Sequence, residues 1–587
     1  MTQATLSETG SVHAGRPDGP TGSGRDRQAL RERTLCVLVT IAALAPFLSK
    51  PFHIDDPLFV WTARRIHDAP LDFYGFAVNW TGIPHPMSEF MRNPPLAAYW
   101  HALVAWIGGW SELSLHLGAL PWAVAATLAT YELARRLCSR PLLATLVFVA
   151  APVFLVSSTS LGSDVPMLAG WLWAVVLWAR GLDERRDRLL AASALLCAVA
   201  ALTKYFAIGL IPLLAAYTLA RERRASSRLA WLGIPLGAIV AYELSTGIGY
   251  GHGLLSAAID FSSGPSAMDS VSGSAAAFER AVVGLLFVGG AVVTPGLFAP
   301  FLWSGRAIAF GAVCASLGAL LLGFQGSLGV LALRVDGVFA WGSLLHIAFF
   351  GLVGLHVVAL GIRDFARHRD PEALLLLLAL AGTLAFGLCF NWTVNARSMI
   401  ALAPVAAILT MRALELPHGS LASGGPWLLT AALVAGGSVG LAVTWADWRL
   451  AWSFRNAAEE MIPAEDAASA QVRFLGHWGF QYYMEQRGAR AVDFSEDRLE
   501  PGDLLLVPEN SPGSNRVPWR FSTIVRKSEI APSPGISIQS WENRAAFHAA
   551  VRGPLPFVVG PNPPERFVLV RLDQPMKAWA GVLVPAR

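Results

Sequence analysis

Long apolar segments constrain the fold of this chain more than any other feature. A helix needs about 20 mostly apolar residues to cross a bilayer. Of the 587 residues, 54% are hydrophobic and 15% are charged, whereas soluble domains carry about 25% charged residues. The sequence therefore predicts a polytopic α-helical membrane protein with about 13 transmembrane helices. The expected spans are residues 34–50, 115–133, 141–160, 165–180, 189–203, 205–220, 229–245, 281–303, 307–325, 338–361, 373–392, 398–414 and 426–445.

One further apolar stretch, residues 95–109, is short and contains His101. Whether it crosses the membrane sets the orientation of every later span. The arginines of residues 1–33 place the N-terminus in the cytoplasm by the positive-inside rule. If residues 95–109 do not cross, four later arginine-bearing loops also fall inside, and if they do cross, all four fall outside. Those loops are residues 135–140, 180–188, 221–228 and 363–369. The rule therefore predicts an interfacial or re-entrant helix that begins at Pro94-Pro95.

The same orientation divides the chain into three parts. Residues 1–33 are polar and rich in Gly, Ser and Arg, which predicts a disordered cytoplasmic tail. Residues 34–445 form the membrane domain, in which residues 51–114 are a first extracytoplasmic loop with juxtamembrane helices. Residues 446–587 have a globular composition and predict a small extracytoplasmic α/β domain.

Short patterns refine the two outer regions. In the C-terminal region, the apolar runs Val472–Leu475 and Leu504–Val507 read as strands, and Gln481–Arg487 between them reads as a helix. The loop 246–280, rich in Gly, Ser and Ala, is expected to be flexible and to act as a lid over a site. The net charge of only +4, with arginines spread among the loops, gives no support to nucleic-acid binding.

Two adjacent carboxylates, Asp55 and Asp56, follow the first apolar segment directly. Ionisable groups at the edge of a membrane are costly and usually functional. Asp is also a good N-cap, and Pro57 suits the first turn of a helix, so the pair could simply begin the next helix. The two interpretations are compatible, because one Asp can cap while its neighbour reacts.

Three isolated cations, Arg92, Lys204 and Arg397, are expected on the same outer side as these carboxylates. A single lysine such as Lys204 is often a residue whose side chain reaches from the membrane to its interface. Three cations together suggest a shared anionic ligand, for which phosphate is the natural candidate. A third carboxylate, Asp164, follows a span on that side. A carboxylate base beside a phosphate clamp suits displacement of a phosphate leaving group by a hydroxyl.

The sequence leaves metal and sugar contacts open. A divalent cation is possible, although no cofactor is firmly predicted. Two candidate ligands, His85 and Glu89, are four residues apart, but Pro84 and Pro86 argue against a helix that would bring them together. The six candidates are His53, Asp55, Asp56, His85, Glu89 and His101. Aromatic residues near the interface could stack on a sugar or form the usual aromatic belt. They are Tyr74, Trp80, Tyr99 and Trp100.

Four motifs resemble the bacterial GT-C glycosyltransferases of the family 39/83 type, which include the protein O-mannosyltransferases and lipid A aminoarabinose transferases. Asp55-Asp56 resembles their first acidic pair, and Arg92-Asn93-Pro94-Pro95-Leu96-Ala97-Ala98-Tyr99 resembles their Pro-Pro-Leu-x-x-Tyr segment. Ser163-Asp164-Val165-Pro166-Met167 is similar to their second acidic motif, and Asn395-Ala396-Arg397-Ser398 to their late Arg-Tyr signature. The resemblance covers about residues 34–415. Two positions differ from the family pattern, since Arg92 replaces Lys or His and Ser398 replaces Tyr.

The resemblance implies a function for each motif. The family uses polyprenyl-phosphate sugars as donors, which implies sugar transfer to a hydroxyl of a lipid, glycan or protein acceptor with inversion at the anomeric carbon. Asp55 would be the general base and Asp56 would support it. Asp164 would position the acceptor or sugar, and Tyr99 would contact substrate. Arg92, Lys204 and Arg397 would hold the lipid phosphate.

The expected location is the bacterial cytoplasmic membrane, with the N-terminus inside and the C-terminal domain outside. Two other classes of protein also have many spans. A transporter or flippase of lipid-linked or sugar substrates would show paired half-repeats and broken, charged helices at mid-membrane, and the sequence shows neither. A receptor or scaffold would leave the charges at the membrane edge without a role.

Overall fold

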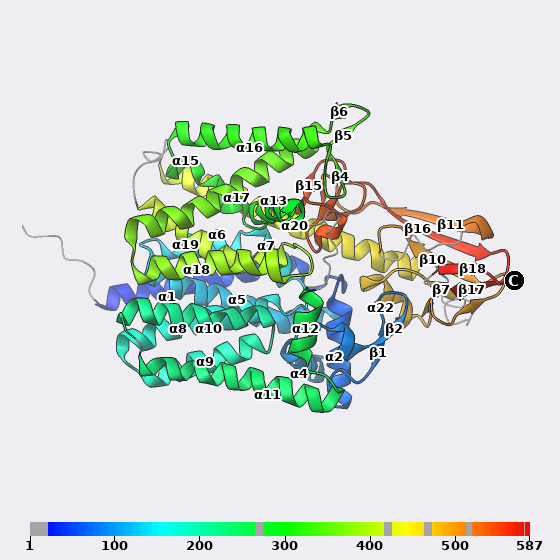
Figure 1. The fold of residues 1–587 in the computed structure, drawn as a ribbon, viewed down its shortest axis with the longest axis horizontal. Coiled ribbons are helices and arrows are strands. Elements are labelled where there is room, and N and C mark those ends of the chain that lie inside the picture. Colours follow the sequence, from blue (N-terminus) through cyan, green and yellow to red (C-terminus); the bar gives the residue numbers. More distant parts are fainter. Residues whose placement is uncertain are drawn as a thin grey trace, which may run out of the picture.

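The thirteen apolar segments are helical in the computed structural model, which describes residues 22–224, 226–263, 274–415, 425–462, 472–511, 519–579 and 582–586 (Figure 1). The helices are α1 (Gly22–Leu44), α5 (Glu112–Leu137), α6 (Pro141–Val149), α7 (Pro152–Ser158), α8 (Asp164–Glu184), α9 (Asp187–Ala201), α10 (Leu210–Glu222), α11 (Gly233–Tyr250), α13 (Ser274–Ala291), α14 (Val293–Leu297), α15 (Ala299–Leu302), α16 (Gly305–Gln325), α17 (Trp341–His368), α18 (Pro371–Ala385), α19 (Leu402–Leu414) and α20 (Pro426–Glu460).

Not every one of these helices spans a membrane by itself. Among the described residues, seven helical stretches are long and apolar enough to cross, or eight if the bent pair α6 and α7 forms one span. That pair bends by 62° where Pro152 begins α7, because proline cannot continue the preceding hydrogen-bond ladder. The chain is therefore a multi-pass membrane protein in which several predicted spans, such as α19 with 13 residues, are short helices.

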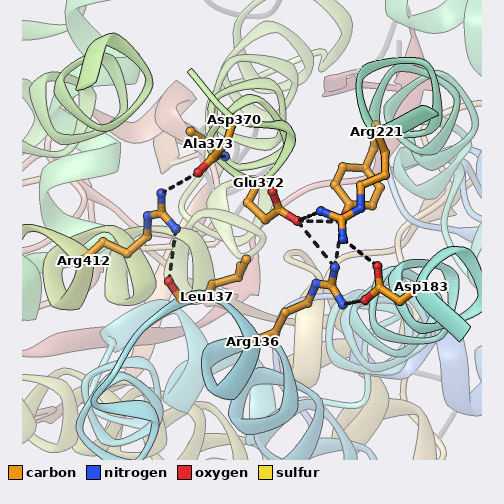
Figure 2. A network of polar contacts seen from close by, with 9 residues as sticks. Arg136, Leu137, Asp183, Arg221, Asp370, Glu372, Ala373 and Arg412 are labelled. Atoms are coloured by element: carbon orange, nitrogen blue, oxygen red, sulfur yellow. Dashed lines mark hydrogen bonds and ion pairs between the residues drawn. The ribbon is translucent and has the colours of Figure 1, made fainter. Parts of the chain in front are cut away.

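The predicted arginine loops lie together at one end of the bundle, opposite the β-rich region (Figure 1). Figure 2 shows the network that joins them. Arg221 of α10 donates to Glu372 of α18 and to Asp183 of α8, each at 2.8 Å. Arg136 of α5 pairs with the same two carboxylates. Four helix ends that are distant in sequence therefore share one set of ion pairs, and we call this the arginine end.

The short helix α4 (Leu96–Gly108) stays at the opposite end. The Leu96 amide at its start donates to the Leu202 carbonyl oxygen at 3.4 Å, and His101 Nε2 lies 2.7 Å from the Leu161 carbonyl oxygen. Both partners are in turns that follow helices rising from the arginine end. α4 therefore lies at the end of the bundle opposite the arginine end, and its interfacial position in the membrane stays a prediction.

The segment predicted to be the first extracytoplasmic loop, residues 51–114, adds small elements around α4, and we call it the first outer loop after that prediction. They are α2 (Asp56–Asp68), β1 (Ala77–Asn79), β2 (Pro84–Pro86) and α3 (Met87–Phe90), with β1 and β2 paired antiparallel. In the loop 246–280 the structure describes α12 (Leu254–Ser263), and residues 264–273 lie outside the described residues. Leu254 of α12 packs in one apolar cluster with Leu58 and Tyr74, so this loop lies over the first outer loop.

The C-terminal region is β-rich. Its five-stranded mixed sheet has the order β11-β16-β10-β7-β8, with β11 (Ser522–Ile530), β16 (Glu565–Leu572), β10 (Leu504–Pro508), β7 (Val472–Phe474) and β8 (Arg490–Ala491). Helix α22 (Trp478–Gln486) connects the parallel strands β7 and β8. The predicted strands and helix are confirmed, but the parallel ladders are limited to β8-β7-β10. Strand β16 pairs antiparallel with both β10 and β11, and the remaining ladders of this region are short and antiparallel.

Two expected boundaries differ from the helices observed. Helix α1 begins at Gly22, so residues 22–33 of the expected tail continue the first apolar helix, and residues 1–21 lie outside the described residues. Helix α20 continues to Glu460, so the change of composition after Trp445 falls inside a helix. A helix can continue while its exposed face becomes polar, so a change of composition does not mark the end of a helix.

Candidate active site

The turn before α2 is strained and tightly held. Ile54 has φ = +50°, a left-handed conformation that is unfavourable for a β-branched residue. Asp56 holds the turn, because its carboxylate accepts the His53 amide at 3.1 Å and the Leu161 amide at 2.7 Å. Asp56 is only 1% exposed, and burial raises its pKa to about 6. The second carboxylate of the pair is therefore a structural clamp between the first outer loop and the turn before α8.

Asp55 is placed very differently from its neighbour. It occupies the N-cap position of α2, but its side chain makes no capping hydrogen bond. Instead, Oδ2 accepts a bond from Arg397 at 2.6 Å, and about a third of the side chain is exposed (33%). A capping role for the Asp55 side chain is thus excluded by its geometry, and the carboxylate is accessible to a substrate.

Arg397 is presented by a short turn, Arg397–Met399, that precedes α19. Asn395 shapes this turn, because its Oδ1 accepts the Ser398 amide at 2.8 Å. The Arg397 guanidinium also interacts electrostatically with Asp164 and Asp56. The Asn395 side chain therefore stabilises the turn that carries Arg397. In this turn the guanidinium interacts with three carboxylates, those of Asp55, Asp56 and Asp164.

Two further predicted site residues, Asp164 and Lys204, lie together. Lys204 lies in the turn between α9 and α10, and its Nζ forms an ion pair with Asp164 Oδ1 at the start of α8. Only 18% of the lysine side chain is exposed. Lys204 is therefore not a cation extended towards the membrane surface, since its charge is directed into the protein.

Arg92 lies under helix α12. Its guanidinium stacks 4.7 Å from the ring centroid of Phe261. Within the described part of the chain, its buried Nε has no hydrogen-bond partner, and burial lowers its pKa. The next residue, Asn93, is fixed by Tyr74 and by Ser163. Arg92 is thus held beside the Asp164 turn with donor capacity left for a ligand.

Tyr99 has a different environment from the other predicted site residues. Its hydroxyl donates to the Pro70 carbonyl oxygen, and its ring packs against Phe73 with 6.2 Å between ring centroids. These contacts hold the loop after α2. The structure thus gives the hydroxyl and the ring of Tyr99 partners within the protein.

The candidate metal ligands do not converge. In the residues that the structure describes, no group of three or more His, Cys, Asp or Glu side chains is placed to hold a metal ion. Asp56 uses both carboxylate oxygens for backbone amides. His53 is fully buried, and burial lowers its pKa to about 3, so its ring is neutral. Among the described residues, the six candidates therefore form no group of three that could hold a metal ion.

A buried network beside the site was not predicted from the sequence. Asp447 of α20 accepts from Lys50 and lies 2.8 Å from His548 Nε2. All three side chains are buried, with 0%, 1% and 5% exposed residue surface for Asp447, Lys50 and His548. A carboxylate near the end of an apolar segment was an available signal for Asp447. Nothing in the local sequence marks His548, which is distant along the chain.

Comparison with known proteins identifies one stretch of the chain. Residues 92–244, which include Arg92, Asp164 and Lys204, match the family model described as dolichyl-phosphate-mannose-protein mannosyltransferase. A search of curated proteins found no match to the sequence.

Solved structures show more distant likenesses. The Archaeoglobus fulgidus oligosaccharyltransferase tethered with an acceptor peptide is 13% identical, with 84% of this chain and 66% of that chain covered and a TM-score of 0.45. ArnT from Cupriavidus metallidurans is 14% identical, with 82% and 93% covered and a TM-score of 0.41. The arabinofuranosyltransferase AftD from Mycobacteria is 12% identical, with 93% and 40% covered and a TM-score of 0.41.

The chain spans just under two thirds of the archaeal oligosaccharyltransferase that it matches. The family model covers the segment in which two of the four sequence motifs lie. For residues 92–244 the predicted resemblance is therefore confirmed, because this segment is similar to the dolichyl-phosphate-mannose-protein mannosyltransferase family.

Proposed function

We propose that the protein transfers a sugar from a polyprenyl-phosphate-linked donor to a hydroxyl of a lipid, glycan or protein acceptor. The observation that carries this proposal is the accessible carboxylate of Asp55, held 2.6 Å from Arg397 beside the partly buried pair of Asp164 and Lys204. A base and several cations at one site match the needs of a reaction that deprotonates a hydroxyl and releases a phosphate.

Asp55 is the proposed general base. It takes the proton of the acceptor hydroxyl as that oxygen bonds to the anomeric carbon from the face opposite the phosphate. The bond between the anomeric carbon and the phosphate oxygen breaks, and its electron pair leaves with polyprenyl phosphate. The configuration inverts, and the proton passes from Asp55 to solvent. Asp56 is a positioning residue, since its carboxylate is 1% exposed and bound to two amides.

Arg92, Lys204 and Arg397 are the proposed phosphate ligands. The phosphate gains negative charge as it leaves, so fixed cations stabilise the transition state more than the bound donor. Lys204 and Arg397 are oriented by Asp164 and Asp55, and Arg92 retains an unpartnered Nε among the described residues. Helix α12, stacked on Arg92 through Phe261, would close over the donor.

The location follows the charge distribution. The arginine end would face the cytoplasm by the positive-inside rule, and the site and the β-rich region would face outward from a bacterial cytoplasmic membrane. This places the reaction where a lipid-linked sugar and an envelope acceptor could meet. Membership of the narrower family 39/83 type is part of this proposal.

A radiolabelled-sugar assay with polyprenyl-phosphate donors in membranes tests the function. Transfer of label to an acceptor, together with release of polyprenyl phosphate, is the expected result. A transporter or flippase would move the donor across the membrane without releasing polyprenyl phosphate, so movement without release would contradict the proposal. Membranes that contain the Asp55→Asn variant are the matched control for background transferases.

A further inference from the structure

The C-terminal region contributes a segment to the wall of the candidate site. The Ala396 amide donates to the Phe547 carbonyl oxygen at 2.9 Å, and the Ala550 amide donates to the Val394 carbonyl oxygen at 2.9 Å. These two bonds fix the chain immediately before Arg397. Two segments that are distant in the sequence therefore lie against each other at the site.

His548 lies between Phe547 and Ala550, which make these bonds, and both its backbone and its side chain are hydrogen-bonded. Its backbone amide donates to Gln539 Oε1 at 3.3 Å, and its Nε2 lies 2.8 Å from Asp447 Oδ1. Burial lowers the pKa of His548, so the neutral ring donates its Nε2 proton to the carboxylate. The position of the segment is thus set by a buried hydrogen bond to helix α20.

Asp447 uses its other oxygen for a second segment. Oδ2 accepts from Lys50, which lies five residues before Asp55, and Lys50 Nζ is also 3.5 Å from Thr159 Oγ1. The charges of Lys50 and Asp447 compensate each other in a site where an unpaired charge would be very costly. One carboxylate therefore connects the segment that leads to Asp55 with the segment that holds Arg397.

We propose that Asp447 and His548 are positioning residues that set the distance between Asp55 and Arg397, so that the C-terminal region is an integral part of the catalytic unit. The inference rests on the proposed function for its activity readout. A buried, fully paired network is a suitable device for this purpose, because its members have one low-energy arrangement. Misplacement of a reacting group by about 1 Å can lower a rate about a hundredfold.

Three variants test the proposal in the full-length protein. His548→Ala removes the bond to Asp447, whereas His548→Gln keeps an N–H donor near the place of Nε2. Arg449→Ala is the matched control, since Arg449 also lies on α20 and ties the C-terminal region by bonds of 3.0 Å to the Ala531 and Pro532 carbonyl oxygens, away from the network.

Two readouts are needed, the transfer rate at saturating donor and hydrogen exchange of the peptide over residues 393–398. In His548→Ala we expect kcat to fall about ten- to a hundredfold and exchange of that peptide to accelerate about tenfold. In His548→Gln and in Arg449→Ala, kcat and the exchange rate of that peptide should each stay within about threefold of the wild-type value. Unchanged exchange and rate in His548→Ala would overturn the proposal, as would an equal loss in Arg449→Ala.

The exchange readout separates this inference from the proposed function. If the wild type transfers no sugar from polyprenyl phosphates but exchange changes as described, the function is wrong and the positioning role stands. If transfer occurs and exchange is unaffected, only the positioning role fails. Should His548→Ala not accumulate, His548→Asn replaces it, because Asn is too short to reach Asp447. Equal kcat in the Asn and Gln variants would then contradict the role.

Discussion

Asp55 and Arg397 lie 342 residues apart in the chain and form an ion pair of 2.6 Å. This contact brings two distant parts of the membrane domain together at the candidate site, because Asp55 follows the first apolar segment and Arg397 precedes α19. It also gives the two acidic neighbours different roles. Asp55 faces a cation and solvent, whereas Asp56 is enclosed by backbone amides.

The first prediction separates these two carboxylates. Asp55→Asn keeps the shape of the side chain but removes its basicity, so kcat should fall about 10²- to 10⁴-fold while the protein still inserts and binds donor. Asp56→Asn should lose less activity but more stability, because its amide group would face a backbone amide and leave it unpaired, at a cost of about 1–3 kcal/mol. Transfer kinetics and thermal unfolding in detergent measure both effects. Full activity in Asp55→Asn would rule it out as the base.

The second prediction concerns the phosphate ligands. Lys204→Ala and Arg397→Ala should each lower kcat/KM for the donor about ten- to a hundredfold, since a hydrogen bond between charged groups contributes about 1.5–3 kcal/mol. Lys527→Ala, an exposed lysine on β11, is the control and should have no effect. Donor kinetics that stay normal in both site variants would leave these cations with a purely structural role.

The third prediction concerns pH and the β-rich region. Burial raises the pKa of Glu565 from its ordinary value of 4.5 to about 7. The folded protein thus holds this proton more tightly than the unfolded chain, so the contribution to stability is full below pH 4.5 and is lost as pH rises to about 7. The loss can reach about 3 kcal/mol.

Glu565→Gln tests this pH dependence because Gln resembles the protonated acid at every pH. Thermal unfolding of wild type and variant should be similar near pH 4.5, and the variant should be the more stable at about pH 7.5. Parallel curves for the two proteins across this range would show that Glu565 does not titrate in the folded state as described.

The fourth prediction concerns topology. Reporter fusions at residues 112 and 500 should give extracytoplasmic signals, because both positions lie at the end that carries Asp55. Fusions at residues 138, 184 and 366 should give cytoplasmic signals, because these positions lie at the arginine end. A cytoplasmic signal at residue 500 from an intact membrane domain would reverse the orientation proposed for the site.

The sequence alone was enough to identify the helices. Apolar length is a local property, so segments such as Trp341–His368 can be located from their own residues. Arginine placement is also local, and it predicts the orientation of the spans and that residues 95–109 do not cross. The acidic pair, Asp164 and the three cations could be proposed as one site, since each lies at a helix end on the same expected side.

Only the tertiary structure decided which of these groups meet and how. The pairing of Asp55 with Arg397 and the enclosure of Asp56 depend on helix packing across hundreds of residues, which no local pattern encodes. The same is true of the bond between Asp447 and His548. Burial sets the protonation and accessibility of such groups, and burial is a property of the assembled fold. The sequence therefore determined the helical elements, while packing determined which carboxylate remained accessible.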